Sequence, residues 1–124
     1  QEGDPHIKSK IRALRVQRAR RRMMAAVPEA DVVVTNPTHY AVALKWDRTK
    51  GGAPICVAKG VDEIAAKIRE RAAEHGVPIH SDPPTARAIH ATVEIGQEIR
   101  VEQYRAVAAA IRFADAMRKR ARKR

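Results

Sequence analysis

The residues of this chain that can do chemistry together form one short stretch, Asn36-Pro37-Thr38-His39. An asparagine normally deamidates when the backbone nitrogen of the next residue attacks its side-chain amide, but proline has no N–H and its nitrogen is fully substituted. The remaining route is the reverse attack, in which the Asn36 side-chain nitrogen adds to its own backbone carbonyl. That attack closes a succinimide ring and expels Pro37 as a new amino terminus, so the stretch predicts a chain that cuts itself.

The neighbouring residue types suit this reaction. A turn that holds the amide near the carbonyl speeds the attack, by about tenfold for each ~1.4 kcal/mol of barrier removed. The amide must lose a proton and the departing proline nitrogen must gain one, and His39 is the residue type suited to both transfers at neutral pH. Thr38 holds the turn or donates a hydrogen bond to the developing oxyanion. The same letters also fit a plain turn, with Asn first and Pro second.

Short apolar runs on either side of this stretch predict strands that position it. Residues 31–35 are rich in β-branched side chains, and residues 40–46 alternate large side chains with alanines and a lysine, which is the period of a strand. The alanines leave room for a helix to pack closely on that face. Residues 55–59 are nearly all apolar and predict a third, central strand covered on both faces, and residues 77–80 predict a short fourth strand.

Capping and spacing signals predict the helices. Asp4-Pro5 begins a long helix that runs to about Ala26 and is too rich in arginine to be buried until its end, where Pro28 stops it. Three further helices are expected: residues 62–74 with Asp62 as cap and Gly76 after the end, residues 85–92, and a last helix from about Glu102 that buries Tyr104, Val107, Ala108 and Ile111. Together these elements predict an α/β fold with a small mixed four-stranded sheet, about four flanking helices and a long N-terminal linker helix.

The net charge of +11 over 124 residues first suggests a nucleic-acid binder. However, residues 8–22 and residues 105–124 each carry eight basic side chains, while residues 31–104 are close to neutral. A nucleic-acid binder more often has its basic stripe on the fold, together with stacking aromatics. We therefore expect no nucleic-acid partner, and we expect the basic ends to be attracted to anionic lipid or an acidic partner. A basic nucleic-acid adaptor in which Asn36-Pro37 is a plain turn is the alternative.

Other kinds of chemistry find little support. The single cysteine, Cys56, lies in an apolar run and is expected to be buried and inert in a reducing compartment. Together with His39, His75, His80 and His90 it shows no zinc-site spacing, so no metal is expected. No phosphate-binding glycine motif occurs, so no cofactor is expected. No apolar stretch approaches the ~20 residues that cross a bilayer, and without an initiator Met or signal peptide the chain is expected to be a soluble piece of something longer.

Several stretches besides the Asn36 motif carry a family resemblance that covers nearly the whole length. They are residues 3–8 (Gly-Asp-Pro-His-Ile-Lys), 19–24 (Ala-Arg-Arg-Arg-Met-Met), 30–44, 57–60 (Val-Ala-Lys-Gly), 83–88 (Pro-Pro-Thr-Ala-Arg-Ala) and 93–99 (Val-Glu-Ile-Gly-Gln-Glu-Ile). In these stretches the chain resembles the cytoplasmic domain of the FlhB/YscU family, the export-switch proteins of bacterial flagellar and injectisome type III secretion. The resemblance to the flagellar branch is the stronger one.

The resemblance implies that the chain cleaves itself at Asn36-Pro37, with Pro37, Thr38 and His39 as the other site residues, and that both pieces stay associated. It implies a role in switching export from rod/hook-type to filament-type substrates at the cytoplasmic face of the bacterial inner membrane. The implied partners are other export-apparatus subunits and export substrates or their chaperones. The implied organisation is a basic linker helix over residues 1–30 leading from an absent transmembrane region, an autocleaving α/β domain over residues 31–115 and a basic tail over residues 116–124.

Two positions depart from the family pattern in the helix after Pro83-Pro84. Thr85 stands where Leu is usual, and His90 stands where an aromatic residue is usual. The cleavage motif is untouched by these changes, but a partner surface on that helix is not carried over to this chain. A third interpretation keeps the family and reduces the domain to passive docking of export components, without a role for cleavage.

Overall fold

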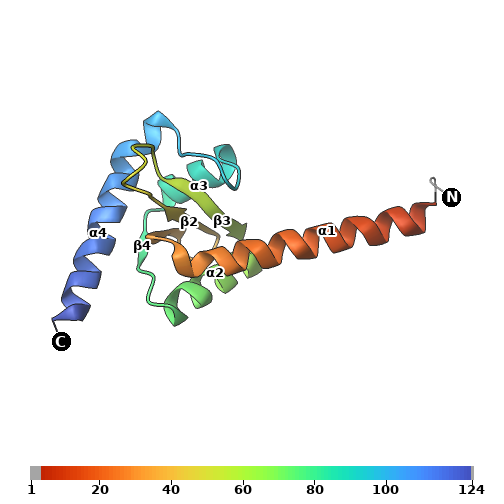
Figure 1. Cartoon of the computed structure of the whole chain (residues 1–124), viewed down its shortest axis with the longest axis horizontal. Coiled ribbons are helices and arrows are strands. Elements are labelled where there is room, and N and C mark those ends of the chain that lie inside the picture. The colour runs from red at the N-terminus through yellow and green to blue at the C-terminus, as the bar shows by residue number, and fades with distance from the viewer. Residues whose placement is uncertain (1–3, 124) are drawn as a thin grey trace.

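The computed structural model describes residues 4–123, which form four α-helices and a four-stranded sheet (Figure 1). The strands β1 (Val32–Asn36), β2 (Tyr40–Lys45), β3 (Ile55–Val61) and β4 (Ile79–Ser81) lie in the order β3-β2-β1-β4. β2 is antiparallel to both neighbours, and β4 is parallel to β1. The helices are α1 (Pro5–Ala26), α2 (Asp62–Glu74), α3 (Pro83–Thr92) and α4 (Tyr104–Arg122), with short 3-10 helices η1 (Val27–Glu29) and η2 (Val101–Gln103). The predicted α/β fold with a mixed four-stranded sheet is confirmed.

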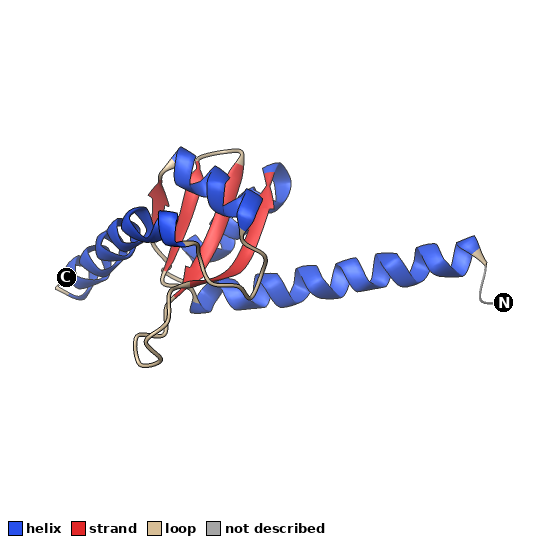
Figure 2. Cartoon of the chain, turned by 90° about the horizontal axis from the view of Figure 1, so that it is seen from above, coloured by secondary structure: helices blue, strands red, loops and turns tan. Residues whose placement is uncertain are grey.

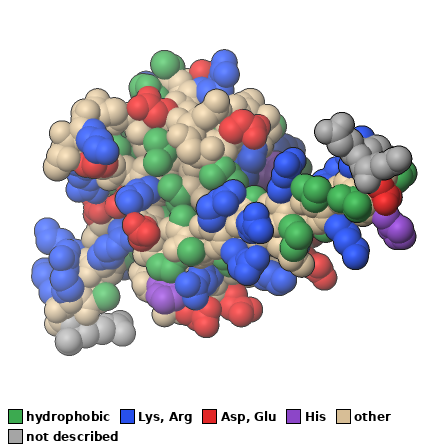
Figure 3. All heavy atoms as spheres, turned by 45° about the vertical axis from the view of Figure 1, so that its right-hand side comes forward, with side chains coloured by type: hydrophobic (Ala, Val, Ile, Leu, Met, Phe, Trp, Pro, Cys, Tyr) green, Lys and Arg blue, Asp and Glu red, His purple; other side chains and the backbone are tan. Residues whose placement is uncertain are grey.

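Helix α1 begins as its capping signal predicts and projects away from the rest of the molecule (Figure 1). The Asp4 carboxylate accepts a hydrogen bond from the His6 amide at 2.9 Å, and Pro5 occupies the first helical position. From Pro5 to Arg22 every side chain is exposed, and Lys and Arg side chains follow the helix in Figure 3. Only the end of the helix is anchored, because Met23 and the following Val27 are buried against the domain.

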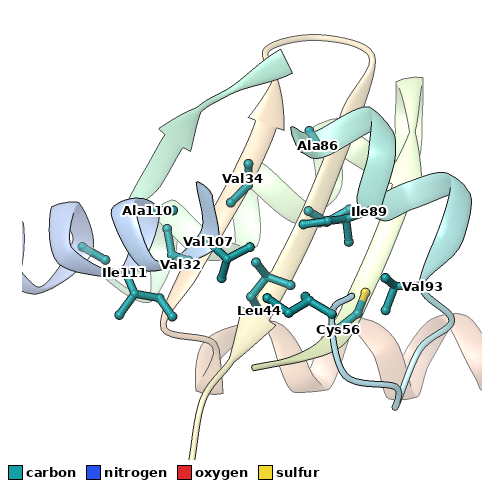
Figure 4. Close-up of a cluster of buried hydrophobic side chains, with 13 residues drawn as sticks. Val32, Val34, Leu44, Cys56, Ala86, Ile89, Val93, Val107, Ala110 and Ile111 are labelled. Atoms are coloured by element: carbon teal, nitrogen blue, oxygen red, sulfur yellow. The ribbon is translucent and has the colours of Figure 1, made fainter. Parts of the chain in front are cut away.

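Helices lie on both faces of the sheet (Figure 2), and each face has its own hydrophobic core. Val42 and Leu44 point to the face covered by α3 and α4, and the alternating Ala41 and Ala43 point to the face covered by α2 and the end of α1. Figure 4 shows the first core, in which side chains from both covering helices meet the strands. The period-two pattern of residues 40–46 therefore predicted both faces of β2 correctly.

Strand β3 is an edge strand, so its predicted central position is wrong. Its outer edge is covered instead by the segment after α3. The Cys56 amide donates to the Gln97 carbonyl at 2.9 Å, and the Gly96 amide donates to the Cys56 carbonyl at 2.7 Å. The backbone edge of this apolar strand is thus paired with a passing segment, while Ile55 and Val57 remain only half-buried.

Helices α2, α3 and α4 differ from the predicted helices in three details. Asp62 is the first residue of α2 and not its cap, which is Val61. α3 begins at Pro83, two residues before the predicted start, with Asp82 as its cap. In α4, Val107 and Ile111 are buried as predicted, but Tyr104 and Ala108 are exposed. The small side chains Ala110 and Ala114 take their place against the sheet, because they let the helix lie close to it.

Helix α4 continues to Arg122, so most of the predicted basic tail over residues 116–124 lies on its last turns. Arg124 lies outside the described residues. The division into linker, domain and tail remains a prediction.

Candidate self-cleavage site

The Asn36-Pro37-Thr38-His39 stretch forms the turn of the β1–β2 hairpin. Asn36 lies opposite Tyr40 as the last pair of the ladder, and the three residues between them form the turn. Proline in the second position of a turn sets the backbone angle that the turn needs. The His39 amide donates a 2.7 Å hydrogen bond to the Asn36 carbonyl and closes the turn. This carbonyl belongs to the Asn36–Pro37 bond, so a donor already lies where negative charge develops if the Asn36 amide attacks.

Burial changes abruptly at the same place. Thr35 is buried and Asn36 is half-buried, whereas Pro37, Thr38 and His39 are exposed. The Thr35 carbonyl accepts a hydrogen bond of 2.9 Å from the Asp82 amide, which ties the end of β1 to the cap of α3. The attacking residue is therefore held by the sheet, while the bond on its C-terminal side is open to water.

The His39 side chain meets a residue that the sequence did not assign to the site. Its Nδ1 atom lies 3.2 Å from Oδ1 of Asp62, and the Asp62 amide donates to the His39 carbonyl at 3.0 Å. Sequence reasoning placed Asp62 at a helix cap because it precedes a helical run. Its proximity to His39 depends on the register between β2 and β3, and no local sequence signal reveals that register.

The structure divides the roles that were predicted for Thr38 and His39. Within residues 4–123, the donor that reaches the Asn36 carbonyl is the backbone amide of His39 and not the hydroxyl of Thr38. Thr38 is an exposed turn residue, and its role at the developing oxyanion remains a prediction. His39 thus supplies two groups: an amide hydrogen at the carbonyl oxygen and an imidazole in the same turn.

The two departures from the family pattern both have a structural role beside this site. Thr85 donates its hydroxyl to the Asp82 carboxylate at 2.6 Å and so stabilises the start of α3. The His90 ring contacts Tyr40, the first residue of β2, with ring centroids 5.0 Å apart. Lys59 donates to the His90 carbonyl at 3.0 Å. Burial, and then the charge of Lys59, lowers the pKa of His90, so the neutral ring is favoured against Tyr40.

The structure also places the other side chains that were considered for chemistry. Cys56 is buried, and burial raises the pKa of its thiol to about 11, so it is a poor nucleophile at neutral pH. Among residues 4–123, no three His, Cys, Asp or Glu side chains gather as a possible metal site. None of the described helices is both long and apolar enough to span a membrane.

The fold and the turn define a class of protein: a small α/β domain with an Asn-Pro bond at the exposed turn of a buried hairpin. The sequence model of the family described as "FlhB HrpN YscU SpaS Family" matches residues 1–114. The chain belongs to this family.

Similar proteins agree with this assignment. The chain is 57% identical over 107 residues to the flagellar biosynthetic protein FlhB of Salmonella typhimurium and 53% identical over 107 residues to that of Bacillus subtilis. In each case the match covers 86% of this chain, and it covers 28% and 30% of the relative, respectively. The chain thus spans less than a third of the length of these relatives.

Solved structures show the same fold. The crystal structure of the cytoplasmic domain of FlhB from Shewanella putrefaciens matches with a TM-score of 0.79 and 47% identity, over 85% of this chain and 81% of that one. A crystal structure of the EscU C-terminal domain that carries an asparagine-to-alanine mutation matches with a TM-score of 0.71 and 28% identity, over 74% of this chain and 92% of that one.

Proposed function

We propose that this chain is the cytoplasmic part of a flagellar type III export protein and cuts its own backbone between Asn36 and Pro37. The observation that carries the proposal is the 2.7 Å hydrogen bond from the His39 amide to the Asn36 carbonyl, at the exposed turn of a buried hairpin. The reaction is internal and happens once, so the chain turns over no separate substrate. The names of the similar proteins, flagellar biosynthetic protein FlhB and cytoplasmic domain of FlhB, support the export role.

The chemistry follows from the turn. The side-chain nitrogen of Asn36 forms a bond to its own carbonyl carbon and loses a proton, while the His39 amide stabilises the negative oxygen. The bond from that carbon to the Pro37 nitrogen then breaks, and the nitrogen takes up a proton. The His39 imidazole suits both transfers, because it accepts the first proton and returns the second. Water finally opens the succinimide, so one piece ends at residue 36 and the other begins at Pro37.

The two pieces are expected to stay together. The first piece contains β1, which lies between β2 and β4 in the sheet. Its Val32, Val33 and Val34 are fully buried, and they contact core residues of the second piece on both faces. The cut breaks one exposed bond and leaves these contacts in place. What changes is the turn, which becomes two free ends on the surface.

Those free ends offer a physical basis for a change of export specificity. A closed turn and two loose ends present different surfaces to export substrates, their chaperones or other export subunits. In this proposal the cut takes part in the change from rod/hook-type to filament-type substrates. The protein works at the cytoplasmic face of the bacterial inner membrane, and basic helix α1 leads toward a membrane-embedded region.

Intact-mass measurement under denaturing conditions tests the cleavage. Asn36 is the only asparagine of the chain, so Asn36→Ala removes every site of asparagine cyclisation. The native sequence at neutral pH should give two masses, which together exceed the full-length mass by one water, and Asn36→Ala should give one. The bonds before the other six prolines are internal controls and should stay intact. Acid must be avoided, because Asp4-Pro5 and Asp82-Pro83 are acid-labile pairs.

A single full-length mass after days at neutral pH would refute the cleavage. The role in switching needs a separate assay, in which the whole protein carrying Asn36→Ala replaces the native one in cells. Export of filament-type substrates should then fail while rod/hook-type export continues. Normal switching by this uncut variant would instead support passive docking.

A further inference from the structure

The register of the sheet brings Asp62 to the cleavage turn. In the antiparallel β2–β3 pair, Tyr40 lies opposite Val61. One step outward from this pair, the residue before Tyr40 faces the residue after Val61, which places His39 beside Asp62. Two contacts follow: the Asp62 amide donates to the His39 carbonyl at 3.0 Å, and the Asp62 carboxylate lies 3.2 Å from Nδ1 of His39.

The backbone of Asp62 has a conformation that needs an explanation. Its φ is +45°, and it is the only non-glycine residue between 4 and 123 with a positive φ. Strand β3 ends at Val61 and α2 begins at the next residue, so the chain reverses without a loop. Gly60 packs so closely on Ile64 that a Cβ atom there would clash with Cγ2 of Ile64. Asp62 completes this sharp reversal.

A glycine at residue 62 would make the same reversal without the cost of a positive φ. Aspartate tolerates the left-handed region better than most residues, but still at some cost. What aspartate adds is the carboxylate, and within the described chain that carboxylate makes its side-chain hydrogen bond with His39. The observation to explain is therefore a charged side chain, kept in a strained backbone position, in contact with the ring of the cleavage turn.

We propose that Asp62 is a positioning residue for the self-cleavage reaction. The inference rests on the proposed function and concerns the same site. The Asp62 carboxylate accepts the Nδ1 hydrogen of the neutral His39 ring, because the hydrogen bond made by one ring nitrogen sets which nitrogen carries the proton. Nε2 is then the free proton acceptor. It takes the proton that Asn36 loses as the new bond forms and returns it to the Pro37 nitrogen as the old bond breaks.

The exposure of His39 and Asp62 limits how much the Asp62 carboxylate can change the cleavage rate. The side chains of His39 and Asp62 are 70% and 71% exposed, so water and salt screen their interaction. Loss of the carboxylate should therefore slow cleavage by no more than about fivefold, and less at high salt. Loss of the ring in His39→Ala should slow it more, by about a hundredfold, because the general acid and base itself is then missing.

The first test measures the tautomer of the His39 ring and does not depend on cleavage. The full chain carrying Asn36→Ala, with its histidines labelled with ¹⁵N, reports by NMR which nitrogen of His39 carries the hydrogen when the ring is neutral. We expect hydrogen on Nδ1, and a shift toward hydrogen on Nε2 when Asp62→Gly is added. Identical ring shifts in the two proteins would overturn the proposal, whether or not the native chain cuts itself.

The second test compares cleavage rates. Asp62→Gly removes the carboxylate and relieves the backbone, and Asp62→Ala removes the carboxylate and keeps the positive φ. Both should slow cleavage to a similar degree if the carboxylate matters, and unequal rates would assign the effect to the backbone. Glu63→Gln is the matched control, because it removes a neighbouring exposed negative charge from the same helix start. This control should cut at the native rate.

A double-variant comparison separates action through His39 from action on the turn as a whole. In the His39→Ala background, Asp62→Gly should cause no further slowing. If Asp62→Gly lowered the cleavage rate by the same factor with and without the His39 ring, the positioning role would be overturned. A native chain that never cuts would refute the proposed function alone, since the NMR comparison still decides whether Asp62 sets the state of His39.

Discussion

The strands of the β1–β2 hairpin and the turn that joins them differ in burial and in the chemical groups they present. Residues 32–35 and 41–44 are all buried between the two layers of helices, whereas residues 37–39 are all exposed. The strands are held by a ladder of five residue pairs and by two cores. The turn is held by the His39 amide at the Asn36 carbonyl and by the contact with Asp62.

This difference separates stability from chemistry along one hairpin. Burial of apolar side chains supplies most of the stability of a small domain, and here that burial lies in the strands. The groups suited to cleavage lie where little apolar surface is buried. A reaction that destroys the turn therefore leaves the stabilising contacts intact. Changes in the strands should alter the free energy of unfolding, and changes in the turn should alter the cleavage rate.

The largest effect on stability is expected from Leu44→Ala. Leu44 is fully buried in the core under α3 and α4 (Figure 4), so its truncation leaves a cavity and should lower the free energy of unfolding by about 3 kcal/mol. Leu14→Ala is the matched control, because Leu14 lies half-exposed on α1 and should change stability by less than about 0.5 kcal/mol. Urea unfolding in the uncut Asn36→Ala background measures both, and equal losses would contradict the assignment of stability to the strands.

A smaller effect should follow from the cut itself. Unfolding of the cut chain separates two pieces, so its apparent stability should fall by about 1.4 kcal/mol for each tenfold dilution. The uncut Asn36→Ala chain should show no such dependence. Denaturant titrations of both proteins at two concentrations test this, with gel filtration to show that the native pieces elute together. Separation of the pieces without denaturant would mean that the strands hold less of the stability than we infer.

The sequence predicted those parts of the fold that local patterns determine. The bounds of α1 follow from Asp4-Pro5 at its start and Pro28 after its end, and the two faces of β2 follow from the alternation of large apolar side chains with alanines. The Asn36-Pro37 motif marked the turn because asparagine and proline favour the first and second positions of a turn. Each of these signals involves residues close in sequence, whose geometry the chain itself sets.

The features that the sequence did not reveal depend on contacts between distant segments. β3 was predicted as central because its side chains are apolar, but its protection comes from Gly96 and Gln97, some forty residues later. Asp62 was predicted as a cap because capping is a local pattern. Its contact with His39 depends on the β2–β3 register, and that register shifts at a bulge between Ala43 and Leu44. A count of residues along the two strands would therefore have given the wrong pairing.

The smallest predicted effect lies where strand and turn meet. Burial, and then the charge of Lys59, lowers the pKa of His90 in the folded chain. At a pH between the folded and the unfolded pKa, the unfolded chain therefore binds a proton at His90 more readily than the folded chain does. The stability from neutral His90 is thus present above its ordinary pKa of about 6.5 and is lost as pH falls through the folded pKa. His90→Phe keeps a ring near Tyr40 without the titration. In the uncut background, its stability should decline less than that of the parent between about pH 7.5 and pH 5, and parallel declines would show that His90 contributes no pH dependence.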